Sequence, residues 1–306
     1  MKVLIPSGGA AANVVLAEAP EPRPHPNEAL VKVEAFSVNR GETFLLEAPK
    51  SGWRPGKDVA GLVVQAAADG SGPAVGRRVV GHPPEAGWAE YVAVPVDALA
   101  ELPDRVGAVQ AAALPLAGLT ALRLLRTAGE VTGRRILITG ASGGVGHYFT
   151  ELAAGAGAEV TAVSRNAERG ARLAELGAAA VVHDVNAARG PFDLVLESTG
   201  GKNFADALDR LAPKGTLIWF GQASREPVTV DFFSLLYGAH SATIRHFSYV
   251  DSDTPYGEDL GTLVRLTAAG RLHPEIGLQA DWSETADAIT ALRERRVRGN
   301  LVLTIS

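Results

Sequence analysis

The spacing of apolar residues divides the chain into a β-rich part and a part in which strands and helices alternate. Residues 1–113 carry short apolar runs between Pro and Gly residues, a pattern typical of strands joined by turns. We expect strands over 1–5, 14–17, 29–37, 59–68, 77–81 and 88–95. This part is therefore predicted to form a barrel-like β domain.

From residue 114 to residue 249 the pattern predicts a parallel, doubly wound sheet. The expected strands are 135–139, 159–164, 181–183, 194–197, 216–220 and 243–249, and the expected helices are 118–127, 145–156, 167–176 and 202–211. After residue 249 the pattern is again like that of residues 1–113. There we expect helices over 259–269 and 284–295 and a strand over 300–305. We predict an α/β protein of two domains, one made of 1–113 and 250–306 and the other of 114–249.

The composition fits a soluble cytoplasmic enzyme, with 306 residues, 46% of them hydrophobic, and a net charge of −5. No apolar stretch reaches the ~18 residues of a membrane span. The charge argues against nucleic acid as the main partner. Cysteine is absent, so the chain can form neither disulfides nor thiolate metal sites. We expect a small-molecule substrate and no bound metal.

The segment Ile136-Leu-Ile-Thr-Gly-Ala-Ser-Gly-Gly-Val-Gly146 joins an apolar strand to a glycine-rich turn and a helix. Its glycines let the backbone approach a ligand and let the helix pack closely on the strand. The N–H groups and the dipole of the helix N-terminus then suit the pyrophosphate of a dinucleotide. A tight turn without a nucleotide is the alternative, because Ala141 stands where the usual pattern has its first glycine.

The residues after the next strand indicate which dinucleotide is bound. NAD sites place an acidic residue there for the ribose hydroxyl, whereas this chain has Ser164, Arg165 and Asn166, with Arg169 one turn later. Guanidinium groups can bind a 2′-phosphate bidentately. This pattern favours NADPH over NADH as the cofactor. Solvated surface arginines are the alternative interpretation.

Eight motifs are spread over nearly the whole chain, at 35–40, 55–61, 75–80, 87–92, 114–122, 140–146, 193–201 and 299–303. They include Ala35-Phe-Ser-Val-Asn-Arg40 and Leu114-Pro-Leu-Ala-Gly-Leu-Thr-Ala-Leu122. Together they resemble the zinc-independent medium-chain dehydrogenases/reductases of the quinone oxidoreductase group. The resemblance implies a GroES-like partial barrel, a Rossmann domain, and NAD(P)H-dependent reduction of a quinone or of an α,β-unsaturated carbonyl (enone or enoyl) substrate.

The same resemblance bears on metal binding. Zinc-dependent relatives carry Gly-His-Glu where this chain has Gly56, Lys57 and Asp58, and they use cysteine ligands that this chain lacks. We therefore expect no catalytic zinc. For Asp58 we expect a bracing role, in which the carboxylate accepts backbone N–H bonds of its turn.

Residue by residue, the resemblance places Asn39 and Thr120 beside the nicotinamide as positioning residues. Ser198, Thr199, Gly200, Phe220, Gly221 and Gln222 follow strands, and ligands of such folds bind outside the carboxyl ends of strands. The other implied cofactor residues are Ser142, Gly143, Gly144 and Val145 at the pyrophosphate and Ser164, Arg165 and Arg169 at the 2′-phosphate. The alternatives are a turn amide for Asn39 and a helix-surface hydroxyl for Thr120.

One position departs from the family pattern. Many quinone oxidoreductases have a tyrosine five residues after the asparagine, and here that residue is Phe44, which cannot donate a proton. We expect the substrate carbonyl to be polarised by a backbone N–H, by Asn39 or by water, and the reduced anion to take a proton from solvent. The other candidate pocket residues are Arg40, Trp53, His246, Tyr249 and Tyr256.

The stretch 241–249 alternates apolar and polar residues at the end of the expected sheet. The last strand of a sheet has backbone N–H and C=O groups without partners along its outer edge. Pairing with the same strand of a second copy would provide those partners. We therefore expect a homodimer. Two other functions stay open: an enoyl reductase devoted to one biosynthetic intermediate, for which a basic docking patch would argue, and an NADPH-binding protein without turnover.

Overall fold

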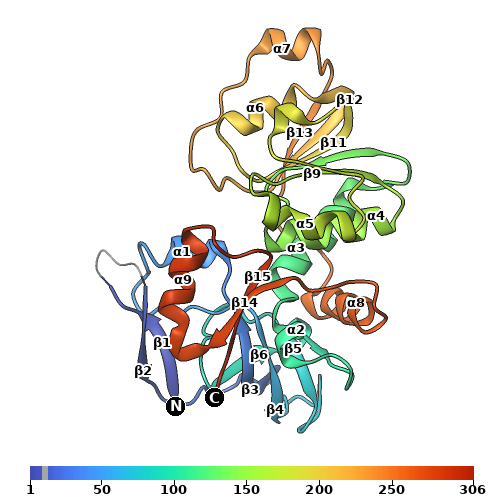
Figure 1. Ribbon diagram of the computed structural model, residues 1–306. Coiled ribbons are helices and arrows are strands. Elements are labelled where there is room, and N and C mark those ends of the chain that lie inside the picture. Colours follow the sequence, from blue (N-terminus) through green and yellow to red (C-terminus); the bar gives the residue numbers. More distant parts are fainter. Residues whose placement is uncertain (9–12) are drawn as a thin grey trace. The chain divides into compact units, whose positions relative to one another are not determined.

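The computed structural model describes residues 1–8 and 13–306, which form two compact units (Figure 1). Unit 1 contains residues 1–119 and 253–306, and unit 2 contains residues 120–252. The expected domain limits, 113/114 and 249/250, lie a few residues before these division points. The first division falls inside helix α3 (Pro115–Ala128), so both units share that helix.

Unit 2 is built on a six-stranded sheet with the order β10-β9-β8-β11-β12-β13. Every neighbouring pair is parallel, which confirms the predicted doubly wound sheet. The chain changes direction across the sheet between β8 and β11, and ligands of such folds bind at this switch point. The strands are β8 (Arg135–Ile138), β9 (Glu159–Val163), β10 (Ala180–Val182), β11 (Phe192–Glu197), β12 (Leu211–Trp219) and β13 (Thr243–His246).

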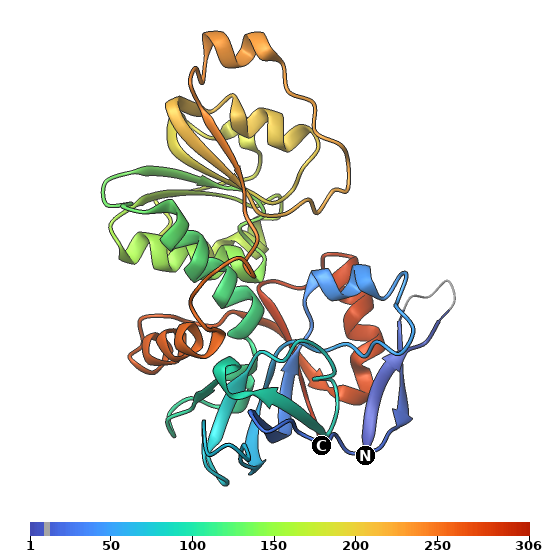
Figure 2. The same ribbon diagram turned by 180° about the vertical axis from the view of Figure 1, so that it is seen from behind.

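Helices cover both faces of this sheet: Figures 1 and 2 show α4 (Gly144–Gly155) and α5 (Ala167–Glu175) on one face and α6 (Lys202–Leu208) on the other. Because both faces are covered, the middle parts of the central strands are apolar, and Leu137, Val195 and Leu217 are fully buried. A 3₁₀ turn, Val185–Ala187, precedes β11. The regular apolar runs explain why these strands could be predicted.

Three features of unit 2 differ from the prediction. Helix α6 ends at Leu208 and β12 begins at Leu211, so the strand begins inside the range expected to be helical. Helix α7 (Phe232–Tyr237) was not expected, and it begins where the Asp231 carboxylate accepts the backbone N–H groups of Phe233 and Ser234. The strand expected over 243–249 ends at His246, because the last backbone bond to β12 runs from the Phe247 N–H to the Trp219 carbonyl. The following residues turn away from the sheet.

Unit 1 is β-rich, as predicted. Its seven-stranded sheet has the order β14-β15-β3-β4-β5-β7, with β6 also paired to β3, and β1 and β2 form a separate antiparallel pair. The C-terminal strand β15 pairs with β3, so both ends of the chain build this unit. The strands are β1 (Lys2–Pro6), β2 (Val14–Glu18), β3 (Glu28–Ser37), β4 (Val59–Gln65), β5 (Arg78–Gly81), β6 (Tyr91–Pro95), β7 (Leu99–Glu101), β14 (Ile276–Asp281) and β15 (Asn300–Thr304).

The short elements of unit 1 escaped prediction, among them β7, β14 and two helices, α1 (Arg40–Leu45) and α2 (Ala108–Ala112). Helix α1 is short and half polar, so it has no apolar periodicity. Its one sequence signal is Asn39 followed three residues later by Glu42, the spacing of a capping box. The longer helices, α8 (Tyr256–Ala268) and α9 (Thr285–Arg293), lie where helices were expected, and 3₁₀ turns cover Val96–Ala98 and Trp282–Glu284.

Candidate functional site

The N-terminus of α4 is shaped to receive an anion. Gly140 has a φ of +62°, which reverses the chain after β8, and α4 follows Gly143, which has no side chain to cap it. The N–H groups of the first helical turn therefore have no partner within the helix. Gly143, Gly144 and Val145 are half-buried and Ser142 is buried. The four residues predicted for the pyrophosphate thus surround one helix N-terminus.

Gly146 brings α4 against the turn. A Cβ atom at Gly146 would lie 2.3 Å from the Ala141 carbonyl oxygen, so only glycine allows this approach. Ala141 is fully buried and its N–H donates to the Val163 carbonyl at 3.1 Å. The alanine in place of the first glycine of the motif is therefore accommodated.

The loops after β11 and β12 lie together at the carboxyl edge of the sheet. The Ala223 N–H donates to the Ser198 carbonyl at 3.0 Å, and the Ser224 N–H donates to the Thr199 carbonyl at 2.8 Å. The Ser198 N–H donates to Thr139 Oγ1 at 3.0 Å, which links the first loop to the end of β8. The structure thus brings residues 198–200 and 220–222 together with the glycine turn.

A buried carboxylate holds the first of these loops. Glu197 is fully buried and accepts hydrogen bonds from Thr139 Oγ1 (2.9 Å) and from the backbone N–H groups of Thr199 (2.8 Å) and Gly200 (3.0 Å). Thr199 Oγ1 also donates to it. This role of Glu197 was not predicted, although an acidic residue at the end of a largely apolar strand could have indicated it.

The residues predicted for the 2′-phosphate lie between β9 and the start of α5. Ser164 is buried and its Oγ donates to the Asn166 carbonyl at 2.9 Å, while Asn166 caps α5 by accepting the Arg169 N–H at 2.9 Å. Arg165 is exposed. Burial, and then the positive charge of Arg165, lower the pKa of the Arg169 guanidinium. Two guanidinium groups thus repel each other here, and a bound anion would relieve that repulsion.

Three other predicted residues of unit 2 have different surroundings. Thr120 is buried in α3. His246 is exposed and ends β13, level with Trp219 of β12 in the sheet register, so it lies at the carboxyl edge. Tyr249 is half-buried, and its carbonyl accepts a hydrogen bond from Arg123 Nη1 at 2.6 Å.

In unit 1, Asn39 belongs to a buried polar cluster centred on Asp58. Asn39 Nδ2 and Ser37 Oγ each lie 2.6 Å from Asp58 Oδ2. Asp58 Oδ1 accepts the Leu116 N–H at 3.0 Å and lies 3.1 Å from His82 Nδ1. The expectation that Asp58 braces its own turn is wrong, because these partners come from other elements of the fold.

Glu42 extends this cluster, and its role was also missed. Its side chain is buried, and its two oxygens accept the backbone N–H groups of Asn39 and Gly56, each at 3.0 Å. Burial, and then the charge of Asp58, raise the pKa of Glu42 to about 8. At neutral pH the carboxyl group therefore holds a proton.

The candidate pocket residues of unit 1 have structural contacts. Phe44 is half-buried in α1, and Trp53 packs against the hydrophobic core. Arg40 Nη2 donates to the Leu292 carbonyl at 2.9 Å. The Tyr256 ring meets the His82 ring edge-on, with the ring centroids 4.9 Å apart.

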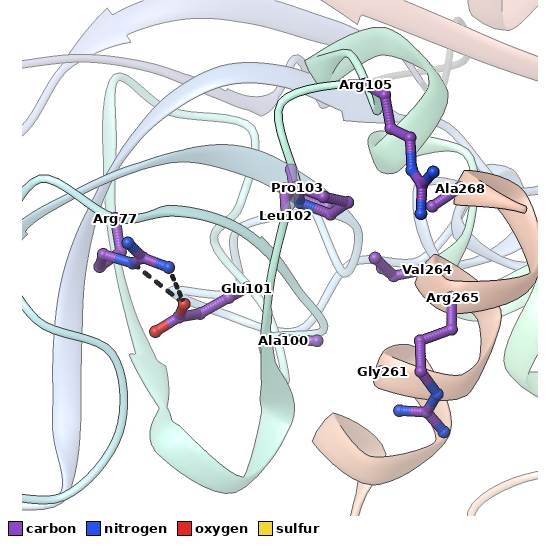
Figure 3. A pocket seen from close by; sticks show the side chains of 10 residues that line it. All are labelled: Arg77, Ala100, Glu101, Leu102, Pro103, Arg105, Gly261, Val264, Arg265 and Ala268. Atoms are coloured by element: carbon purple, nitrogen blue, oxygen red, sulfur yellow. Dashed lines mark hydrogen bonds and ion pairs between the residues drawn. The ribbon is translucent and has the colours of Figure 1, made fainter.

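Unit 1 also has a groove of about 620 Å³ between α8 and the chain around β7, which holds none of the predicted site residues (Figure 3). An exposed ion pair, Arg77 with Glu101, lies at one side, and Arg105 and Arg265 lie across from it. All of these charged side chains are exposed. The groove is therefore not the predicted site.

Within residues 1–8 and 13–306, no group of three or more His, Asp or Glu side chains could hold a metal ion. No helix in this part of the chain is both long and apolar enough to cross a membrane.

Two family models match the chain. The alcohol dehydrogenase GroES-like domain matches residues 25–104, and the zinc-binding dehydrogenase domain matches residues 144–266. Despite that description, the residues present do not fit the zinc scheme, because cysteine is absent and the described part of the chain has no ligand cluster. Zinc independence itself stays a prediction.

Full-length relatives agree with the family models. The chain is 31% identical over 300 residues to a quinone oxidoreductase of Pseudomonas aeruginosa, and this alignment covers 92% of each protein. It is 36% identical to a chloroplast envelope quinone oxidoreductase homolog of Arabidopsis thaliana over 213 residues, which is 64% of this chain and 63% of that protein.

A solved structure is similar over the whole fold. The mycobacterial protein Rv1454c, complexed with NADPH, superposes with a TM-score of 0.88 at 27% identity, covering 99% of this chain and all of that one. The chain belongs to the medium-chain dehydrogenase/reductase family, in its quinone oxidoreductase-like group.

The buried Glu42 predicts a pH-dependent stability. In the unfolded chain this carboxyl group titrates near its ordinary pKa of 4.5, whereas in the folded chain its pKa is about 8. Between these values the folded chain binds more protons, so the free energy of unfolding falls as the pH rises and this contribution levels off above about pH 8. Glu42→Gln should therefore make the free energy of unfolding less dependent on pH. Denaturant unfolding from pH 5 to 9 measures this.

The control is Glu21→Gln, which neutralises an exposed carboxylate. It should leave the pH dependence of wild type unchanged. An unaltered slope in Glu42→Gln would show that Glu42 ionises at an ordinary pH in the folded protein.

Proposed function

We propose that the chain is an NADPH-dependent oxidoreductase that reduces a quinone or an α,β-unsaturated carbonyl compound without a metal ion. The observation that carries the proposal is the pairing of an uncapped helix N-terminus at Gly143–Gly144 with Arg165 and Arg169 after the next strand. The helix N-terminus binds a pyrophosphate, and the two arginines bind a 2′-phosphate. The quinone oxidoreductase relatives and the NADPH complex of Rv1454c support it.

The residues present fit this cofactor. The N–H groups of the first turn of α4 would hold the pyrophosphate, and Gly146 keeps that turn close to the sheet. Ser164, Arg165 and Arg169 would hold the 2′-phosphate, and Glu197 fixes the loop 198–200 at the carboxyl edge of the sheet. Bound NADPH supplies the hydride for the reduction.

The protein side of the chemistry is then mostly positioning. Phe44 offers no proton, so the reduced product takes its proton from solvent. This suits substrates whose reduced anion is already stabilised by conjugation. An alkoxide from a simple ketone would lack such stabilisation, and the loss of one stabilising donor typically costs about 3 kcal/mol of barrier.

The reaction class can be tested by following NADPH oxidation in the presence of a chelator. Quinones and strongly activated enones should be reduced, and simple ketones should react at least about 100-fold more slowly, because general acid help is worth about 10²- to 10⁴-fold. Phe44→Tyr should raise the rate at which weak electrophiles are reduced and leave the rate of quinone reduction nearly unchanged. Equally fast ketone reduction by wild type would contradict the proposal, and binding of NADPH without any turnover would favour a silent binding protein.

The cofactor preference can be tested by titration. NADPH should bind at least about tenfold more tightly than NADH, which corresponds to about 1.4 kcal/mol. Arg165→Asp should narrow or reverse this preference, because it replaces a phosphate-binding cation by an acid. The matched control, Arg172→Asp, makes the same charge change further along α5, where Arg172 pairs with Glu175, and should keep the preference. Equal affinities of wild type for both cofactors would contradict the proposal.

A homodimer through unit 2 belongs to the same proposal. Strand β13 ends the sheet, its outer edge has no partner strand among the described residues, and all four of its residues are exposed. The apolar side chains of α7 are also exposed, with Tyr237 at 82% and Phe232 at 68%. A second copy that pairs along β13 would satisfy the edge and bury apolar surface.

Ile244→Lys should break this dimer, because a charge at a sheet edge opposes pairing with another strand. Ile244 is 45% exposed on β13. Light scattering at micromolar concentration should give a dimer for wild type and a monomer for the variant. The control Leu16→Lys changes a residue of β2 in unit 1 that is 52% exposed, and this variant should remain dimeric. A monomeric wild type would refute the proposed assembly.

A further inference from the structure

The groove of unit 1 opens between α8 and β7, the last strand in the order of its sheet. The two elements touch at the start of α8, where a Cβ atom at Gly257 would lie 2.5 Å from the Leu99 carbonyl oxygen, so this contact requires glycine. One turn later, a Cβ atom at Gly261 would meet only Arg265 Nη1, at 3.4 Å, among the described residues. Beyond the first contact, α8 and the chain after β7 therefore leave space between them (Figure 3).

One wall of the groove is a single face of α8. Its residues are spaced i, i+3, i+4 and i+7, so they form one row along the helix. They are Gly261, Val264, Arg265 and Ala268. Three of them are small or apolar, and Val264 is buried at the floor. A second helix can pack closely on a row of this kind.

The opposite wall is formed by the end of β7 and the residues after it. Leu102 is buried and Pro103 is exposed, so this wall is also largely apolar. It is a poor edge for an added strand, because the Leu102 N–H already donates to the Arg78 carbonyl at 2.8 Å and Pro103 has no N–H. The groove therefore suits a helix better than an extended chain.

The charged residues of the lining are three arginines and one glutamate. Arg77 forms an exposed ion pair with Glu101. Glu101, and then Asp104, raise the pKa of the Arg77 guanidinium, so the acids at this end of the groove act on Arg77. The excess of positive charge comes from the other two arginines, in a chain whose net charge is −5.

These two arginines, Arg105 and Arg265, have no acidic partner among the described residues. Arg265 Nη2 donates to a neutral hydroxyl, Thr262 Oγ1, at 3.0 Å. The two side chains come from opposite walls, and in Figure 3 Arg105 points towards the level of Ala268, whereas Arg265 extends along Gly261. Gly261 and Ala268 are seven residues apart, which corresponds to about 10 Å along a helix. Two cations thus stand towards the two ends of an apolar surface.

We propose that the groove is a docking site for a partner protein that presents an amphipathic helix with acidic residues on both sides of an apolar stretch. The apolar side chains of that helix would lie over Leu102 and Val264. Two carboxylates seven residues apart would match the spacing of Arg105 and Arg265. The inference does not rest on the proposed function, because every lining residue belongs to unit 1 and none is a predicted cofactor residue.

A synthetic helix can serve as the probe. It has about 18 residues, leucines at i, i+3, i+4 and i+7, glutamates seven residues apart beside them, and a fluorescent label. Titration followed by anisotropy should give a Kd of about 10 to 100 µM, and replacing the glutamates by glutamines should weaken binding at least about tenfold. Added salt should also weaken it, because exposed charges are screened. Equal affinities for the two peptides, or no binding of either, would overturn the inference.

Charge reversal shows whether the two arginines are the contacts. Arg105→Glu/Arg265→Glu should weaken binding of the acidic probe at least about tenfold and should bind a probe with lysines in place of the glutamates, which wild type should not. Misfolding cannot produce that gain. The matched control, Arg23→Glu/Lys50→Glu, reverses two exposed cations of unit 1 that do not line the groove and should behave as wild type. Undiminished binding of the acidic probe by Arg105→Glu/Arg265→Glu would refute the proposed contacts.

Gly261→Trp tests the groove without a change in charge. The indole should fill the space beside α8 and weaken the acidic probe at least about tenfold. Gly261→Ala adds only the Cβ atom that the groove accommodates and should bind within about threefold of wild type. Thermal unfolding checks that both variants are folded. If Gly261→Trp bound the probe as wild type does, the docking site would lie elsewhere.

A small anionic amphiphile is the other occupant that this chemistry allows, since pockets for small ligands have volumes of about 300 to 1,000 Å³. Dodecanoate offers one carboxylate and so can pair with only one of the two arginines. It should displace the acidic probe only at concentrations at least about tenfold above the Kd of the probe. Displacement by dodecanoate below that Kd would assign the groove to a small molecule and overturn the proposal of a protein partner.

Discussion

The close packing of α4 on the turn after β8 is the contact on which the candidate site depends. A Cβ atom at Gly146 would lie 2.3 Å from the Ala141 carbonyl oxygen, so this approach requires glycine. The approach fixes the helix N-terminus at the carboxyl edge of the sheet, where its free N–H groups and dipole can meet an anion. The loops after β11 and β12 are joined to the same edge by backbone hydrogen bonds. A change in helix position would separate these parts.

Two buried carboxylates do comparable work in the two units. Glu197 accepts backbone N–H groups and holds the loop 198–200, and Asp58 accepts the amide of Asn39 and a buried serine hydroxyl. A buried charge is tolerated where several donors satisfy it, and it then makes its surroundings rigid. Arg165 after β9 differs, because it is exposed. The buried acids thus hold loops and side chains of the candidate site in place.

Much of unit 2 could be predicted because its strands have apolar middle parts and its longer helices have regular periodicity. The glycine turn and Ser164–Arg165 indicated the site by motif alone. Helix α7 could not be predicted in this way, because its six residues are mostly apolar and exposed, so they show no periodic pattern. In unit 1, α1 is too short and polar for such a pattern.

The cluster around Asp58 is beyond sequence reasoning for another reason. Its partners, Ser37, Asn39, His82 and Leu116, are spread over some eighty positions and meet only through the antiparallel sheet and the start of α3. The local sequence predicted that Asp58 braces its own turn. In the structure its partners are instead distant in the sequence. The same holds for the protonated Glu42, whose raised pKa comes from burial that the sequence does not display.

Hydrogen–deuterium exchange with and without NADPH tests the central claim most directly, since it reports on backbone N–H groups. Bound cofactor should slow exchange at residues 142–146, at 164–170 and in the loops 198–200 and 220–222. The first turn of α4 should show the largest effect, because its N–H groups would gain an acceptor. Binding of NADPH with unchanged exchange in that turn would contradict the account.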